Sequence, residues 1–317
     1  MPELTSRGTI HTVTPPTVSA DLKGRIVEFA RDSSTEISPH DEGILPELAS
    51  TLPPRTTVYV AHTPKATLAD VVRTAVKTAA VGLRASPHIV ARRIDSEQAL
   101  RAALRELKES GVEQVLLVAG DRNPPAGEFS STLQILDSGA TVDAGIKQIG
   151  VAGHPEGHPA VGTDELWQAL QYKQAFAERT GTRMHIATQF SFKPDAVLGW
   201  SRLLVERGIT LPVHLGVAGP TPLPKLIKFA VQCGIGASFG SLIKNMGAIG
   251  GLTGLATTPD QMVSGLVRGG AGQSWNRVIH PHVYAFGGVM ATAKWLRCMV
   301  DGAFELDASG EKFTVAP

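Results

Sequence analysis

The chain of 317 residues is poor in cysteine, has few aromatic side chains and carries no excess of one charge. Its two cysteines, Cys233 and Cys298, are too few for a disulfide framework, which suits a reducing compartment, so we expect a cytoplasmic protein. Thirty basic against twenty-nine acidic side chains leave a net charge of +1. No overall field attracts nucleic acid or anionic lipid, so we predict neither as a partner. The number of assembled chains stays open, a homo-oligomer included.

Long hydrophobic runs are also missing. Residues 1–17 have no apolar stretch of signal-peptide length, and their Pro and Thr content predicts a disordered arm before a single domain over residues 18–317. The best candidate for a membrane span is the Gly-rich segment 234–256, but Lys244 at its centre and its many small residues argue against one. We therefore predict a loop-rich segment there.

Several catalytic motifs are absent. The sequence has no phosphate-binding P-loop, no Gly-x-Ser-x-Gly elbow and no reactive-cysteine motif. Barrel hydrolases commonly place a His-x-His pair on the first strand, where this chain offers only His40, beyond the strand. His154 and His158 are each followed by proline, so the helical spacing of metal ligands does not apply to them. We predict no metal site, and a metal-dependent hydrolase is the weakest alternative.

Short apolar runs rich in β-formers recur along the chain and predict eight strands. These runs cover residues 35–38, 56–61, 87–91, 114–120, 148–153, 185–190, 211–216 and 282–286.

Stretches with helical spacing lie between most of these runs. In residues 96–110, Leu100, Ala103, Leu104 and Leu107 form one apolar stripe opposite charged residues. Alternating strands and helices predict a parallel sheet, and eight such units fit a closed (β/α)8 TIM barrel better than two doubly wound domains. An extra N-terminal helix is predicted before the first strand, across the lower end of the barrel, from Leu22, Ile26, Phe29 and Ala30.

Polar residues gather in or just after the predicted strands, where the chemistry of such barrels lies. They are Glu36, His62, His88, Asp121, His154, His158, Gln189, His214 and Tyr284. Taken singly, His214 is typical of an ordinary buried histidine, and Asp121 could cap its loop through an Asx turn. Together they indicate a site, because burying several polar groups at one end of a sheet is costly unless they pair or bind a ligand.

The strand ends resemble those of the methylenetetrahydrofolate reductase family from about residue 33 to about residue 297. The matching segments are "TEISPHD", "ASPHIVARRIDSEQAL", "LLVAGDRNPP", "HPEGHP", "ATQFSFKPDAV", "LGVAGPTPLPKLIKFA" and "PHVYAFGG". No single motif is highly specific for the family, but the occurrence of all seven in the same order along the strands is specific for it. The resemblance implies a flavin-dependent barrel that uses NAD(P)H to reduce 5,10-methylenetetrahydrofolate in one-carbon and methionine metabolism.

The resemblance also implies roles for individual residues. Glu36 falls on the general acid and Asp121 on the catalytic aspartate, which also lies at the flavin. The other positions that match FAD-binding residues are His88, Gly120, His154, His158 and Lys173. Those that match substrate-binding residues are Gln189, Leu223, Tyr284 and Phe286.

Three positions depart from the family pattern. Ala119 replaces an arginine, His154 an aromatic residue, and Leu223 a phenylalanine expected to cover the substrate. Two of these positions lie on the flavin side, so a flavin-free reductase or a folate-dependent methyl transferase stays open, as does a non-catalytic folate-binding subunit. Glu28 would replace Glu36 as the acid if residues 21–32 formed the first strand, but their helical spacing favours Glu36. The choice between NADH and NADPH, and the need for an electron-delivering partner, are also open.

Overall fold

The computed structural model describes residues 18–232, 256–309 and 313–315. The predicted N-terminal arm, and all of the Gly-rich segment except its last residue, lie outside the described residues. Within them, no helix is long and apolar enough to cross a membrane.

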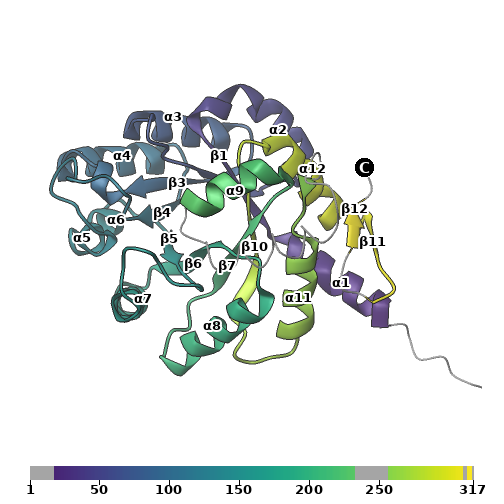
Figure 1. Ribbon diagram of the computed structural model, residues 1–317. Coiled ribbons are helices and arrows are strands. Elements are labelled where there is room, and N and C mark those ends of the chain that lie inside the picture. The colour runs from purple at the N-terminus through teal and green to yellow at the C-terminus, as the bar shows by residue number, and fades with distance from the viewer. Residues whose placement is uncertain (1–17, 233–255, 310–312, 316–317) are drawn as a thin grey trace, which may run out of the picture.

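Eight parallel strands close into a barrel in the order β1-β10-β7-β6-β5-β4-β3-β2 (Figure 1). The bounds are β1 Ser34–Ile37, β2 Thr57–Val60, β3 Arg84–Val90, β4 Gln114–Val118, β5 Gln148–Gly153, β6 Arg183–Phe190, β7 Val213–Ala218 and β10 Val278–Tyr284. Apart from the closing pair β1 and β10, each strand lies beside its predecessor in the chain, as in a (β/α)8 barrel. The predicted fold class is confirmed.

Helices surround this barrel, and short elements connect them (Figure 1). The helices are α1 Val18–Arg31, α2 Leu45–Thr51, α3 Leu68–Ala80, α4 Glu97–Glu109, α5 Thr132–Asp137, α6 Ala140–Asp143, α7 Thr163–Thr180, α8 Pro194–Glu206, α9 Leu223–Gln232, α11 Asp260–Gly270 and α12 Val289–Val300, with the 3₁₀ turns η1 Pro39–Ile44 and η2 Ala91–Arg93. Two antiparallel pairs lie outside the barrel: β8 Thr221–Pro222 with β9 Ala256–Thr257, and β11 Phe304–Leu306 with β12 Phe313–Val315.

Helix α4 shows how the local sequence builds this outer layer. The Ser96 hydroxyl accepts a hydrogen bond from the Ala99 amide at 3.2 Å and caps the first turn. The predicted stripe of Leu100, Ala103, Leu104 and Leu107 is buried, while the charged face is turned to solvent. An amphipathic helix of this kind attaches to the barrel by its apolar stripe.

Helix α1 confirms the predicted N-terminal helix, but its position is different. Leu22, Ile26 and Ala30 are buried as predicted. The helix packs against α11, α12 and β10, so it lies in the outer helical layer and does not simply cross the lower end.

The third and eighth strands begin earlier than predicted, because both continue through a proline. Pro87 lies within β3 and Pro281 within β10, although proline cannot donate to a ladder. Pairing of β3 with β4 begins only at His88, and pairing of β10 with β1 only at His282. Each proline therefore precedes the start of one of its two ladders, where its missing N–H breaks no bond.

The barrel divides the buried residues into two regions. The larger, between strands and helices, is an apolar shell that includes Ile89, Leu117, Ile149, Ile186 and Leu215. The smaller lies inside the barrel, where side chains of non-adjacent strands meet. There the Tyr59 hydroxyl of β2 contacts His185 of β6 at 2.7 Å and His214 of β7 at 3.4 Å. The interior is thus largely polar, unlike the branched aliphatic filling usual in such barrels.

Candidate active site

Glu36 lies on β1 with its side chain beside His88 of β3. The two side chains are 20% and 15% exposed, and Glu36 Oε2 is 4.0 Å from His88 Nε2. Burial, with a smaller contribution from the nearby negative charge of Asp41, raises the pKa of Glu36 to about 7. Burial and the neighbouring His62 lower the pKa of His88 to about 4. The proton of the pair therefore resides on the carboxyl group, and His88 is neutral.

The alternative acid, Glu28, lies elsewhere. It belongs to the outer helix α1 and forms an exposed ion pair with Arg31. A carboxylate in that position is solvated and distant from the strand ends. Glu36 is therefore the better candidate for acid chemistry.

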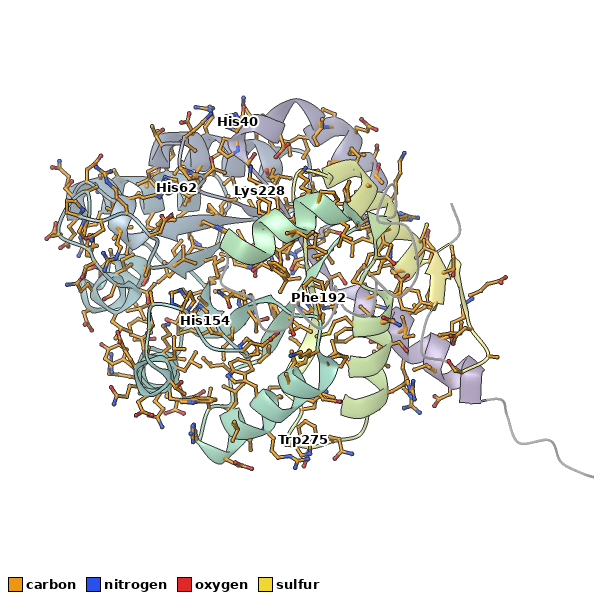
Figure 2. All side chains as sticks on the ribbon, viewed as in Figure 1. His40, His62, His154, Phe192, Lys228 and Trp275 are labelled. Carbon is orange, nitrogen blue, oxygen red and sulfur yellow. The ribbon has the colours of Figure 1, made fainter. Side chains whose placement is uncertain are left out.

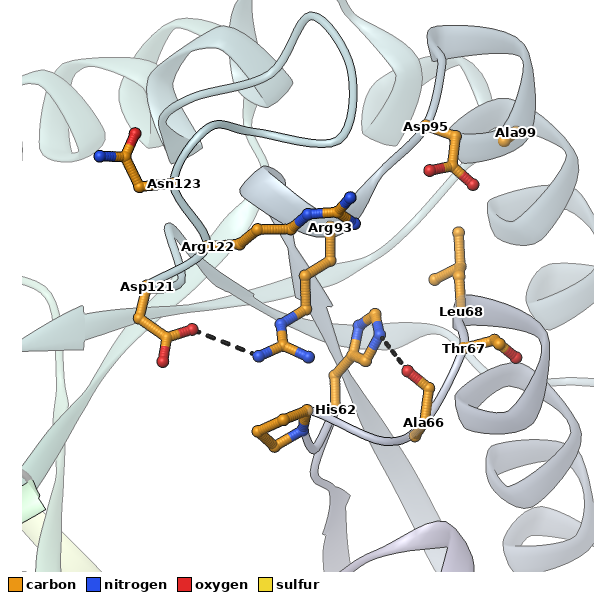
Figure 3. Close-up of a pocket in the computed structure, with 11 residues that line it drawn as sticks. His62, Ala66, Thr67, Leu68, Arg93, Asp95, Ala99, Asp121, Arg122 and Asn123 are labelled. Carbon is orange, nitrogen blue, oxygen red and sulfur yellow. Dashed lines mark hydrogen bonds and ion pairs between the residues drawn. The ribbon is translucent and has the colours of Figure 1, made fainter.

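Asp121 follows β4 and lines a rim cavity of about 630 Å³ together with His62 and Arg93 (Figure 3). Its carboxylate accepts a hydrogen bond from Arg93 Nη2 at 3.2 Å, and its side chain is 86% exposed. Arg93 also donates to the Thr63 carbonyl at 3.1 Å, which fixes the guanidinium at the rim. Glu36 is not among the described residues that line this cavity. The two candidate catalytic carboxyl groups therefore do not share one pocket.

Two structural constraints favour glycine at position 120, the residue before Asp121. The φ of Gly120 is +86°, a left-handed conformation that other residues rarely adopt, and an added Cβ would lie 2.4 Å from Val90 Cγ1. The turn after β4 can therefore pass close to the end of β3. This sharp turn carries Asp121 away from the strand.

His154 and His158 come together in the loop after β5, with their ring centroids 5.0 Å apart. Lys173 of α7 is buried, and this burial lowers the pKa of its ammonium group to about 8. The pKa of His154 falls to about 4 because of burial and of the charges of His158 and Lys173. Ser191 donates to Glu156 Oε1 at 2.7 Å, which links the loop to the end of β6. Figure 2 shows His154 well apart from His62 of the rim cavity.

The four predicted substrate residues lie near the ends of β6, β7 and β10. Leu223 and Phe286 are buried in a small apolar cluster with Phe190. Tyr284 packs on this cluster and donates to the Thr188 carbonyl at 2.9 Å, and Gln189 is the next residue along β6. Helix α9, which begins at Leu223, passes over the barrel strands in the view of Figure 1. In this conformation Leu223 contacts protein side chains and leaves little surface for a ligand.

The sequence reasoning missed most of the polar barrel interior. His280 and His282 of β10 point inward with His214 and His185, and the Ser34 hydroxyl is 2.9 Å from His282 Nδ1. The signal was present, because His280, His282 and Tyr284 alternate along one strand and therefore share a face. The predicted strand began at His282, so this alternation was not recognised. Among the described residues, no three acidic, histidine or cysteine side chains are placed to hold a metal ion.

The family model for methylenetetrahydrofolate reductase matches residues 50–239, well over half of the chain.

This chain belongs to the methylenetetrahydrofolate reductase family.

The family is one of oxidoreductases, and its members generally bind a flavin. The matched residues include the rim aspartate, the histidine loop and the buried lysine, whereas Glu36 and Tyr284 lie outside them. Among solved structures, a Burkholderia cenocepacia J2315 protein described as a lyase/mutase is 14% identical, with a TM-score of 0.46 and 89% of each chain covered.

Proposed function

We propose that this member of the family reduces 5,10-methylenetetrahydrofolate to 5-methyltetrahydrofolate with NAD(P)H, through a bound flavin. The observation that carries the proposal is Glu36: a carboxyl group inside the barrel whose pKa of about 7 leaves a proton available near neutral pH. Opening the imidazolidine ring of the substrate requires such a proton. Family membership supplies the reaction class.

The residues after β5 suit the diphosphate of a flavin. The Lys173 ammonium group is buried, and this burial lowers its pKa to about 8. A buried uncompensated charge is unfavourable and is stabilised by an anion. His154 and His158 lie in the same loop and can donate to phosphate oxygens. A bound flavin would supply hydride transfer between the dinucleotide and the folate.

Glu36 would act at N10 of the folate. Its carboxyl group donates a proton to N10 as the bond between N10 and the bridging carbon breaks, which leaves a cationic iminium at N5. A hydride then converts this iminium to the methyl group. Burial raises the pKa of Glu36, so the proton is retained until the substrate nitrogen accepts it.

Asp121 and Gln189 would hold the substrate. A carboxylate at the Asp121 position stabilises the positive charge of the iminium, and Arg93 keeps that carboxylate at the rim. Because Asp121 is highly exposed and Glu36 lies deeper, the substrate would have to bridge them. The Gln189 side chain would orient the pterin from the end of β6.

A flavin-free reductase or a methyl transferase is the second candidate. The observation that favours it is the loss of two flavin-side residues, since Ala119 and His154 stand where the family has an arginine and an aromatic residue. The buried Lys173, in contrast, favours a flavin-binding enzyme, because its charge suits the flavin diphosphate. The visible absorption spectrum of the purified protein separates the two: flavin bands support the proposal, and a colourless protein after saturation with FAD contradicts it.

The catalytic role is tested with Glu36→Gln. We expect folate reduction to fall about 100-fold or more, the usual contribution of a general acid, while oxidation of NAD(P)H by a quinone is retained. The matched control is Glu28→Gln, which changes a carboxylate on the outer helix and leaves both half-reactions unaltered. Equal loss of both half-reactions in Glu36→Gln would assign Glu36 a structural role.

A further inference from the structure

Glu36 has an environment that opposes its ionised form. Burial disfavours the carboxylate, and Asp41 in η1 adds a negative charge nearby. Asp41 is held in place because its carboxylate accepts hydrogen bonds from the Ser38 amide and hydroxyl, both at 2.8 Å. An acid that gives up its proton here leaves a carboxylate that needs a hydrogen-bond donor.

His88 is the group positioned to provide one. Its Nε2 atom is buried, has no hydrogen-bond partner, and lies 4.0 Å from Glu36 Oε2. An unpartnered buried nitrogen is costly to maintain and is rare in folded proteins. A shift of about 1 Å would bring the two atoms into hydrogen-bond distance.

The other side chains around His88 do not satisfy Nε2. Tyr59 packs edge-on against the imidazole with the ring centroids 6.1 Å apart, and its hydroxyl contacts His185 instead. His282 and His62 are close enough to interact electrostatically with His88, and both are predominantly neutral histidines with lowered pKa values. Glu36 is thus the described acidic group that faces His88.

We propose that His88 is a positioning residue for Glu36: its Nε2–H moves onto the Glu36 carboxylate as the proton leaves and stabilises the ionised acid. The proposal rests on the proposed function for its place in the reaction, but the pairing itself is measurable without substrate. It adds a partner on β3 to an acid on β1. Without that donor, Glu36 would be a weaker acid.

Two variants separate the donor from the imidazole. In His88→Gln, the amide Nε2 can still donate to Glu36, whereas in His88→Leu the donor is lost at similar bulk. His40→Gln is the matched control, because His40 is an exposed histidine on η1, four residues after Glu36. Folding of each variant is checked by circular dichroism and thermal melting.

The primary measurement is the infrared band of the protonated Glu36 carboxyl group, assigned by its absence in Glu36→Gln and titrated from pH 5 to pH 9 in the complete protein. We expect a midpoint below 7 in the unmodified protein and in His40→Gln, because the value of about 7 results from burial and Asp41 without a donor from His88. In His88→Leu the midpoint should rise by about one pH unit, since the ionised form loses its donor, and in His88→Gln it should stay close to that of the unmodified protein. A midpoint in His88→Leu that is unchanged or lower overturns the proposal.

The second measurement is the pH dependence of single-turnover folate reduction. Activity requires protonated Glu36, so the rate should be full below the pKa and fall as the pH rises through it. The falling limb should move upward in His88→Leu by the same amount as the infrared midpoint. If the infrared shift occurs but the unmodified protein reduces no folate, the pairing stands and the proposed function fails. If folate is reduced but the limb does not move with His88, the pairing is rejected.

Discussion

The inside of the barrel and the shell around it are built from opposite kinds of side chain. The shell consists of aliphatic and aromatic residues that bury their apolar surface between strands and helices. The interior holds Tyr59, His185, His214, His280 and His282, which contact one another through hydrogen bonds and ring stacking. The shell contains most of the buried apolar side chains, and the interior holds the polar groups below the active site.

The two regions also differ in their response to protons. Burial lowers the pKa of His185 to about 3 and that of His280 to about 4, and the neighbouring imidazole of His280 strengthens the effect at His185. Burial and the surrounding histidines hold the pKa of His214 and His282 well below the usual value. The interior is therefore stable while its histidines are neutral, whereas the buried side chains of the shell, among the described residues, are apolar.

The largest expected effect is acid unfolding driven by the interior. Folded-state pKa values below the unfolded value of 6.5 mean that the unfolded chain binds more protons as the pH falls below 6.5. For each such histidine, the free energy of unfolding then falls by about 1.4 kcal/mol for every pH unit below 6.5, until the pH reaches the pKa of that histidine in the folded state. His185 and His280 would together remove a large part of the ~5–15 kcal/mol stability of a typical domain, and His214 and His282 act in the same direction. Urea unfolding followed by circular dichroism should show a steep loss between pH 6 and pH 4, and a flat urea midpoint there would contradict it.

Neighbouring leucines of β4 give the next largest effect, because they face opposite regions. Leu117 belongs to the shell and is fully buried, whereas Leu116 faces the interior beside Tyr59 and Ala187. Leu117→Ala should lower the free energy of unfolding by about 2–5 kcal/mol, through lost apolar burial and an unfilled cavity. Leu116→Ala should lower the free energy of unfolding by a smaller amount than Leu117→Ala, since the surroundings of Leu116 are partly polar. Equal losses in the two variants, measured by urea unfolding at pH 7.5, would remove the distinction between shell and interior.

Glu36 has a pH dependence opposite to that of the histidines. Its folded pKa of about 7 lies above the unfolded value of 4.5, so the folded state binds the extra proton, and stability is lost as the pH rises from 4.5 through 7. Glu36→Gln should therefore stabilise the protein by about 1–3 kcal/mol at pH 8.5 and by little at pH 4.5. Urea unfolding at the two pH values measures the difference. A variant less stable than the parent at pH 8.5 would count against a destabilising buried carboxylate.

The smallest expected effect comes from one hydroxyl group of the interior. Tyr59→Phe keeps the ring and removes the hydrogen bond to His185 Nε2. The free energy of unfolding should fall by about 0.5–1.5 kcal/mol, the net contribution of a typical intramolecular hydrogen bond. Thermal unfolding at pH 7.5 measures it. Full retention of stability would mean that the interior hydrogen bonds are replaceable.

Much of the fold could be predicted from local patterns. The stripe of α4 and the burial of Ile26 in α1 follow from helical spacing, and both are observed. Strand ends were less predictable where proline intervened, since Pro281 looks like a boundary in the sequence but lies inside β10. Whether a proline can be accommodated depends on where the neighbouring ladder begins, which is a property of the sheet.

The candidate site divides in the same way. Its residue types and their order after the strands were visible in the sequence, including Glu36, Asp121 and Lys173. Their grouping was not: Glu36 faces His88, Asp121 faces Arg93, and Lys173 faces the histidine loop. Leu223, at the position that matches a substrate-covering phenylalanine, packs with Phe190 and Phe286, and its role toward a substrate stays a prediction.

The sequence by itself determined the alternation of strands and helices, the absence of membrane-spanning and P-loop patterns, and the reactive residues carried by each strand end, because these depend on short-range periodicity and composition. Only the tertiary structure decided that burial raises the pKa of Glu36 and lowers that of His88 beside it, that Lys173 is buried, and that histidines from β6, β7 and β10 meet inside the barrel. Charge states and contacts between distant strands depend on burial and on barrel closure, which no local stretch of sequence contains.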